Sequence, residues 1–237
     1  QGKTVHAAML DLFGSIESFH SMVGAAKETI TGVVEFGAVD AVHTNEQFPL
    51  AKAIGTFLRT APTARTNLHV ASPQELLQGL LTGRFHVILT PTISTAKAIE
   101  AHLVFREFQQ LYCGQDHPLF HLDDRQITRE MVSRYPFVGR SYETPPNHIG
   151  LDVHWQSEVS YMESTALMIF SGELLGYLPD HYAESHIREG KLRALDCVKA
   201  GFHNDFYVCT HKAHQNRAAV HFKKQIVDSC AKMIGKA

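Results

Sequence analysis

One stretch of sequence decides the fold: Leu68-His69-Val70-Ala71-Ser72-Pro73-Gln74-Glu75-Leu76-Leu77-Gln78-Gly79-Leu80-Leu81-Thr82-Gly83-Arg84-Phe85-His86-Val87-Ile88-Leu89. Its two ends are short apolar runs, which are typical of buried strands. Between them, Ser72 can cap a helix whose first turn holds Pro73 and Glu75, and Gly83 can close that helix. A strand, a helix and a second strand at this spacing predict parallel strands joined by a right-handed crossover.

The same alternation extends in both directions from this stretch. Before it, an apolar strand over 33–39 precedes helical spacing over 48–58, which Pro62 ends, and after it 102–113 reads as extended. A second set follows, with helices over 128–134, 162–171 and 217–233 and strands over 137–139, 151–160, 174–178, 192–198 and 205–210. This order predicts an α/β protein of two lobes, in which the chain returns to the first lobe at its end.

The start of the chain carries a different pattern. Its apolar residues alternate in steps of four and three, and they are Val5, Met9, Leu12, Ile16, Phe19, Val23, Ala26 and Ile30. Such a heptad repeat keeps one narrow apolar seam facing a partner helix. The seam favours a homo-oligomer over the alternative, an amphipathic helix packed on its own domain.

Composition limits the class of protein. The 237 residues, 44% hydrophobic and 19% charged, suffice for one large or two smaller cores and exclude a disordered chain. The net charge is −2 and the only dense basic pair is Lys223-Lys224, so we expect no direct DNA binding by these residues. Sparse cysteines and the lack of a long apolar run indicate a cytoplasmic protein with no membrane partner. The start at Gln1 shows neither an initiator methionine nor a signal pattern, so we expect preceding residues.

Several segments, in this order, resemble the LysR-type bacterial transcription regulators. They are 32–36, Phe48-Pro49-Leu50, 83–89, His117-Pro118-Leu119, 171–179 and Gly190-Lys191-Leu192. His86 stands where the family commonly has Asp, and Glu173-Leu174 departs from its usual second glycine. The resemblance implies a linker helix and a two-lobed effector-binding part, preceded in the full protein by a winged helix-turn-helix head that binds DNA.

The resemblance also implies a fold class and domain boundaries. The class is α/β, with two Rossmann-like subdomains of the periplasmic-binding-protein-like type 2. We expect a linker and dimerisation helix over 1–31, lobe 1 over 32–109 and 211–237, and lobe 2 over 110–210.

The expected effector site lies in the cleft between the lobes. In open α/β sheets, ligands bind beyond the carboxyl ends of parallel strands, where helix N-termini attract anions. This rule selects the loops that family effector sites also use. The predicted effector-binding residues are Val42, His43, Thr44, Asn45, Ser72, Thr90, Thr92, Arg140, Ser141, Tyr142, Ser160 and Met162.

Each of these residues also has an ordinary structural interpretation. Thr44 or Asn45 can cap the following helix, and Ser72 is a competent cap whatever else it does. Arg140 can hold a carboxylate bidentately or form a surface salt bridge. His43 can be an ordinary exposed histidine. Tyr142 and Trp155 can stack an aromatic effector, although we expect Trp155 to be a core residue.

Signals for chemistry are weak. The sixteen histidines include His211 and His214, but no further Cys or carboxylate completes a zinc site at that spacing, so we expect no metal and no cofactor. Cys197 and Cys209, on predicted neighbouring strands, read as small buried hydrophobes and not as redox sensors. Asp40 and Glu158 are the only obvious acid–base candidates, and neither has a clear partner. We therefore expect no enzymatic activity.

The predicted function is allosteric regulation of transcription. A small, anionic effector biases the cleft, and the linker helix passes the change to DNA-binding heads of a homodimer or homotetramer. One alternative is a solute-binding protein of the same fold, which would have a signal sequence and act as a monomer. A second alternative is an enzyme on this fold.

Overall fold

The computed structural model describes residues 9, 12, 15–16, 30–142 and 149–234, and it divides the chain into two compact units. Unit 1 comprises residues 1–105 and 205–237, and unit 2 comprises residues 106–204. The boundaries between the units, at 105/106 and 204/205, lie four and six residues before the expected boundaries at 109/110 and 210/211. Strands β4 (Ile99–Gly114) and β9 (Phe202–His211) run through the divisions without a break, so no turn residue marks them in the sequence.

The predicted linker helix over 1–31 lies almost wholly outside the described residues. Of its heptad positions, Met9, Leu12 and Ile16 are described as helical, with 51%, 59% and 43% of their surface exposed. Self-association through this helix stays a prediction.

Unit 1 is built on a sheet with strand order β2-β1-β3-β9. Strand β1 (Thr31–Ala38) is parallel to both β2 (Thr63–Val70) and β3 (Val87–Thr90), and β9 is antiparallel to β3. The helices of the unit are α2 (Leu50–Thr60), α3 (Pro73–Leu81) and α7 (Arg217–Ile234). The parallel strands and the α3 crossover are those that the stretch 68–89 predicts.

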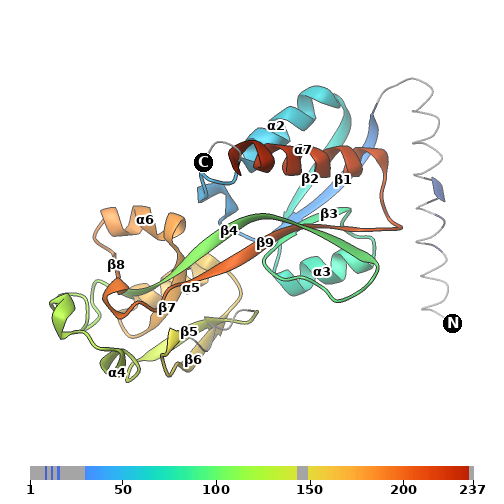
Figure 1. Ribbon diagram of the computed structural model, residues 1–237. Helices are drawn as coiled ribbons and strands as arrows, with labels where there is room; N and C mark the ends of the chain where they lie inside the picture. The colour runs from blue at the N-terminus through green and yellow to red at the C-terminus, as the bar shows by residue number, and fades with distance from the viewer. Residues whose placement is uncertain (1–8, 10–11, 13–14, 17–29, 143–148, 235–237) are drawn as a thin grey trace. The chain divides into compact units, whose positions relative to one another are not determined.

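Successive residues of β1 show how the helices cover both faces of this sheet. The Phe36 ring lies 5.1 Å from the ring of Phe222 on α7. A Cβ on the next residue, Gly37, would instead meet Leu76 of α3 at 2.5 Å. Because neighbouring side chains of a strand point to opposite faces, α7 and α3 lie on opposite sides of the sheet, with α2 beside α7 (Figure 1).

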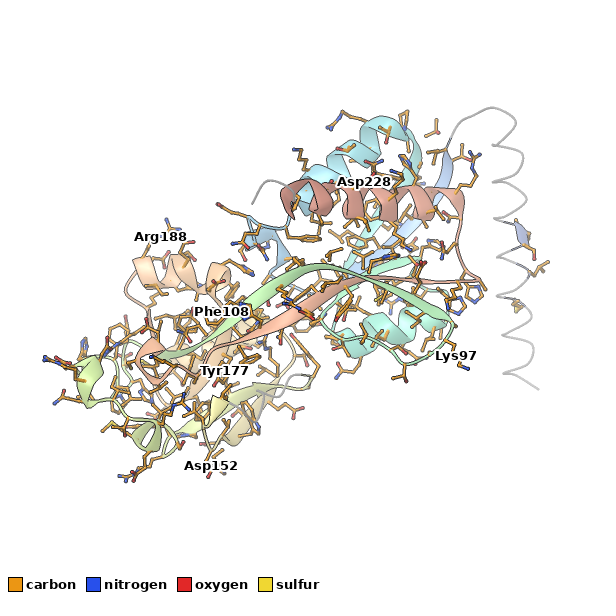
Figure 2. The ribbon with its side chains drawn as sticks, viewed as in Figure 1. Lys97, Phe108, Asp152, Tyr177, Arg188 and Asp228 are labelled. Atoms are coloured by element: carbon orange, nitrogen blue, oxygen red, sulfur yellow. The ribbon has the colours of Figure 1, made fainter. Side chains whose placement is uncertain are left out.

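Unit 2 is built on a sheet with strand order β4-β7-β5-β6, and a short strand, β8 (Leu192–Ala194), pairs with β4. Strand β5 (Pro136–Arg140) is parallel to β6 (His154–Val159) and to β7 (Leu175–Pro179), whereas β4 is antiparallel to β7 and β8. The helices are α4 (Arg129–Val132), α5 (Met162–Phe170) and α6 (Asp180–Arg188). Tyr177 of β7 is buried against Phe202, whereas Asp152 and Arg188 lie at the surface of the unit (Figure 2).

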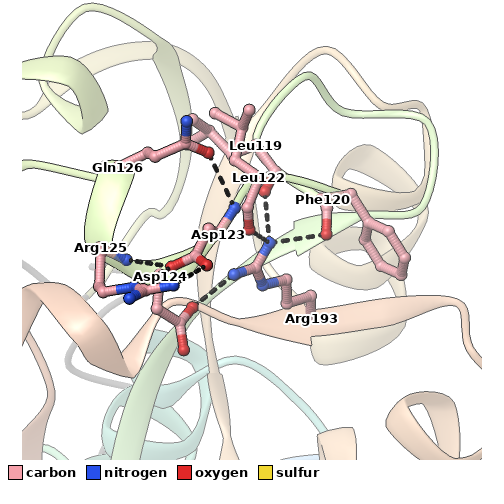
Figure 3. Close-up of polar contacts among 8 residues, drawn as sticks. All are labelled: Leu119, Phe120, Leu122, Asp123, Asp124, Arg125, Gln126 and Arg193. Carbon is pink, nitrogen blue, oxygen red and sulfur yellow. Dashed lines mark hydrogen bonds and ion pairs between the residues drawn. The ribbon is translucent and has the colours of Figure 1, made fainter.

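A single side chain, Arg193 of β8, organises the loop that follows β4. Its Nη1 donates to the carbonyl oxygens of Leu119, Phe120 and Leu122 at 2.8, 2.7 and 2.7 Å. Its Nη2 pairs with the Asp124 carboxylate (Figure 3). Arg193 therefore supplies charge-assisted hydrogen bonds to carbonyl groups of the loop that no strand or helix satisfies.

Three expectations about unit 2 are wrong. Helix α6 is not among the predicted elements, because most of its residues are polar and only Ala183 in it is buried. The predicted strand over 192–198 ends at Ala194, and a 3₁₀ turn over Asp196–Val198 replaces its second half. Trp155 is 38% exposed and not a core residue, because β6 is the edge strand of the sheet.

The cysteines also differ from expectation in their placement. Cys197 lies in the 3₁₀ turn of unit 2 and Cys209 lies in the unit 1 part of β9, so the two are not on neighbouring strands. Burial raises the pKa of Cys113 and of Cys209 to about 12. Thiols with such pKa values are protonated near neutral pH and react slowly.

Candidate functional site: the strand-end loops

In unit 1, the three parallel strands end at one edge of the sheet. Ala38 of β1 is in register with Val70 of β2 and with Leu89 of β3. The backbone bonds continue past the strand ends, since Ala71 N donates to Ala38 O at 3.1 Å and Val39 N donates to Leu89 O at 3.2 Å. The loops that carry Val42–Asn45, Ser72 and Thr90–Thr92 therefore start side by side.

The first of these loops is held by its own polar groups. Thr44 Oγ1 donates to Ala41 O at 2.8 Å, and Asn45 Oδ1, in a residue 7% exposed, accepts from Gln47 N at 3.0 Å. Neither residue caps α2, whose N-cap is Pro49, so the capping interpretation is wrong. Within the loop, Val42 belongs to the core of unit 1 and His43 is exposed.

The second loop is a capping box, as the sequence predicts. Ser72 Oγ accepts from Glu75 N at 3.4 Å, and Glu75 Oε2 accepts from Ser72 N at 2.9 Å and from Ser72 Oγ at 2.8 Å. The hydrogen bond from the Ser72 backbone lowers the pKa of Glu75. The Ser72 hydroxyl thus has a structural role at the start of α3.

The third loop follows β3. Thr90 is fully buried, and its Oγ1 accepts from Thr92 N at 3.2 Å. Thr92 is half-buried. The two threonines form a short turn directly after the strand, at the sheet edge where the other two loops begin.

In unit 2, three parallel strands again end at one edge. Arg140, the last residue of β5, is in register with Val159 of β6, and Ser141 N donates to Val159 O at 3.1 Å. Ser160 follows β6, and Met162 is the first residue of α5. The fold therefore brings together Arg140, Ser141, Tyr142, Ser160 and Met162, all of which the sequence predicts as effector-binding residues.

Arg140 is the central charge of this group, and it is only 6% exposed. Its Nη1 donates to Met162 Sδ at 3.0 Å, and its Nη2 donates to Gln109 Oε1 at 2.7 Å. Its Cζ lies 5.7 Å from the centroid of the Tyr142 ring, within the range of a cation–π contact. The interpretation of Arg140 as the partner in a surface salt bridge is wrong, because the side chain is buried.

Three further residues belong to this group and are not among those predicted from the sequence. Gln109 is fully buried, and its Nε2 donates to Glu107 Oε1 at 2.5 Å. Glu107 is 4% exposed, and its Oε2 accepts a hydrogen bond from His181 Nε2 at 2.9 Å. The signal that could have found Glu107 and Gln109 is their alternation, because two polar residues on one face of a strand need partners when that face is buried.

No metal site or membrane span accompanies these loops. Within residues 9, 12, 15–16, 30–142 and 149–234, no three His, Cys, Asp or Glu side chains gather where a metal ion could bind. Over the same part of the chain, every helix is too short or too polar to cross a bilayer.

Two solved structures share the fold at low sequence identity. The effector-binding domain of QuiR in complex with shikimate matches with a TM-score of 0.70 and 13% identity, over 85% of this chain and 98% of that domain. The regulatory domain of Synechocystis CcmR in complex with 2-PG matches with a TM-score of 0.67 and 14% identity, over 86% of this chain and 99% of that domain. Both confirm the two-lobed α/β fold that the sequence predicts.

Sequence comparison gives a curated relative and a family. The HTH-type transcriptional activator BauR of Pseudomonas aeruginosa is 29% identical over 197 residues, which are 82% of this chain and 65% of BauR. This chain thus spans about two-thirds of the length of that activator. The family model described as the LysR substrate binding domain matches residues 28–231. By this match over most of its length, the chain belongs to the LysR substrate-binding-domain family.

Proposed function

We propose that this chain is the effector-binding part of a LysR-type transcription regulator and that its effector is a small anion held by Arg140. The observation that carries the proposal is the position of that guanidinium. It is buried, it lies at the carboxyl end of a parallel strand, and two of its donors face the neutral acceptors Met162 Sδ and Gln109 Oε1. A guanidinium at this position can hold a carboxylate or a phosphate bidentately, and a bidentate pair of this kind is among the stronger hydrogen-bonded contacts in proteins.

The surroundings of Arg140 suit a carboxylate or a phosphate. Met162 opens α5, so the first backbone N–H groups of that helix and its positive dipole end lie beside the guanidinium. The hydroxyls of Ser141 and Ser160 lie on the two loops that start next to each other there. In unit 1, His43, Thr44, Asn45, Ser72, Thr90 and Thr92 stay predicted effector-binding residues on the strand-end loops of that unit.

The proposed mechanism is regulatory and not catalytic. Differential affinity of the anion for two arrangements of the chain shifts the equilibrium between them. In a homodimer or homotetramer, the predicted linker helix over 1–31 passes that shift to DNA-binding heads. This proposal places the protein in the cytoplasm, gives it no enzymatic activity, and agrees with the description of BauR as an activator.

A thermal-shift screen tests the proposal. Small carboxylates and phosphates, with shikimate and 2-PG among them, are expected to raise the Tm of the wild-type chain in a concentration-dependent way. Arg140→Met keeps the side-chain volume but removes the charge, so it should abolish the shift from every hit. Arg134→Met is the matched control, because Arg134 is also in unit 2 but its side chain is 72% exposed. A hit that shifts Arg140→Met as much as wild type would remove Arg140 from the site.

Ser72 needs a separate test because it caps α3. Ser72→Thr keeps the hydroxyl that caps α3 and donates to Glu75 but adds a methyl group to the loop, so a part of Ser72 in anion binding should show as a weaker affinity at an unchanged Tm of the free protein. A lower Tm with unchanged anion affinity would leave Ser72 with its capping role alone.

A further inference from the structure

A chain of hydrogen bonds ends at Arg140 in unit 2, and we name it the Gln109 relay. It runs from His181 Nε2 to Glu107 Oε2, from Gln109 Nε2 to Glu107 Oε1, and from Arg140 Nη2 to Gln109 Oε1. Its members come from three elements, since Glu107 and Gln109 lie on β4, Arg140 ends β5 and His181 lies in the first turn of α6. Glu107, Gln109 and Arg140 are all more than nine-tenths buried.

The relay can have only one direction. An ionised carboxylate only accepts hydrogen bonds, so the group of Gln109 that faces Glu107 must be its NH₂. A guanidinium only donates, so the group that faces Arg140 must be the amide oxygen. Both ends of the relay therefore require the same orientation of the Gln109 amide. In any glutamine, the hydrogen-bond partners determine which side of the amide holds the oxygen and which holds the nitrogen.

We propose that Gln109 is a positioning residue for Arg140, and that Glu107, oriented by His181, fixes which way the Gln109 amide faces. The inference rests on the proposed function, because it matters for binding only if Arg140 holds the anion. Gln109 supplies an acceptor that holds one edge of the guanidinium in place.

The substitution Glu107→Gln reverses the direction of the relay. With His181 kept in the tautomer that carries a proton on Nε2, as it must to donate to the Glu107 carboxylate, the new amide at position 107 accepts that proton on its oxygen and turns its NH₂ toward Gln109. Gln109 must then present its oxygen to position 107 and its NH₂ to Arg140, where two donors face each other. Arg140 Nη2 loses its amide acceptor, while Nη1 keeps Met162 Sδ, although no side chain of the relay has changed appreciably in volume.

Nuclear magnetic resonance of the ligand-free chain, with ¹³C,¹⁵N-labelled arginine, measures the loss of this hydrogen bond as faster hydrogen exchange at Arg140. In the wild type, the Arg140 Nη hydrogens should exchange slowly with water. In Glu107→Gln their exchange should accelerate at least about tenfold, because a charge-assisted hydrogen bond is lost. Glu130→Gln is the matched control, since it removes the same charge from a side chain of unit 2 that is 81% exposed. It should leave the Arg140 signals unchanged.

A second variant covers the case in which Glu107→Gln does not fold. Gln109→Met keeps the length of the side chain and removes both of its hydrogen bonds, so it should give the same faster exchange at Arg140. Unchanged Arg140 exchange in either folded variant would overturn the proposal.

Binding of malonate, measured by titration calorimetry, separates this inference from the proposed function. Malonate affinity should fall about 10- to 100-fold in Glu107→Gln and Gln109→Met, and it should be unchanged in Glu130→Gln. If malonate binds the wild type and Arg140→Met equally, the proposed function fails while the exchange data still decide the relay. If Arg140→Met loses binding but both relay variants keep it, the relay is overturned and the proposed function stands.

Discussion

Replacing Arg193 by Met should destabilise unit 2 by about 2–4 kcal/mol, even though Arg193 lies on a strand of only three residues. The estimate follows from the hydrogen bonds of Nη1, which has two hydrogens for three carbonyl acceptors. Two full charge-assisted bonds, at about 1.5–3 kcal/mol each, set an upper value of about 6 kcal/mol. Because the side chain is 20% exposed, water can reach some of the freed carbonyls and reduces the loss. The pair with Asp124 adds little, since that carboxylate is 61% exposed.

The assay is urea denaturation followed by tryptophan fluorescence. The protein has one tryptophan, and Trp155 lies in unit 2 against Phe137, so its emission reports on the unit that Arg193 supports. Arg125→Met is the matched control, because Arg125 carries the same charge in the same loop but its side chain is 90% exposed beside Asp123. The control should unfold at the wild-type midpoint. If Arg193→Met also unfolded at the wild-type midpoint, the backbone turns alone would hold the loop, and the hydrogen bonds of Arg193 would not stabilise unit 2.

Three further predictions concern stability and reactivity. Burial lowers the pKa of His117 to about 4, so the free energy of unfolding should fall by at most about 3 kcal/mol as the pH drops from about 6.5 to about 4, because only the unfolded histidine takes up a proton there. Acid titration of His117→Asn should show a flatter decline, and an identical slope would contradict the assignment. A Cβ on Gly114 would lie 2.3 Å from the backbone oxygen of Ile169, so Gly114→Ala should cost about 3 kcal/mol in urea denaturation, whereas Gly55→Ala in α2 should be neutral or stabilising. Cys209 should resist maleimide in the native protein and react on unfolding, and fast native labelling of that thiol would show that β9 opens.

Most of the helices and strands follow from local patterns. The capping box of Ser72 and Glu75 starts α3 where the sequence predicts, since a cap uses only groups a few residues apart. Helix α6 is not predicted from the sequence, because most of its residues are polar and it buries Ala183 alone. Trp155 was assigned to the core because nothing in its own strand says that β6 lies at the sheet edge.

Local patterns are enough to predict the α/β class, the parallel strands and the loops at their carboxyl ends, because these depend on periodicity, caps and turns within short segments. The burial of Arg140 and its hydrogen-bonded chain through Gln109 and Glu107 to His181 depend instead on how distant segments pack. These residues are far apart in the chain, and their hydrogen bonds exist only once β4, β5 and α6 have packed together. A hydrogen bond between distant residues leaves no periodic trace in the sequence, whereas the desolvation that makes it necessary arises only in the folded core.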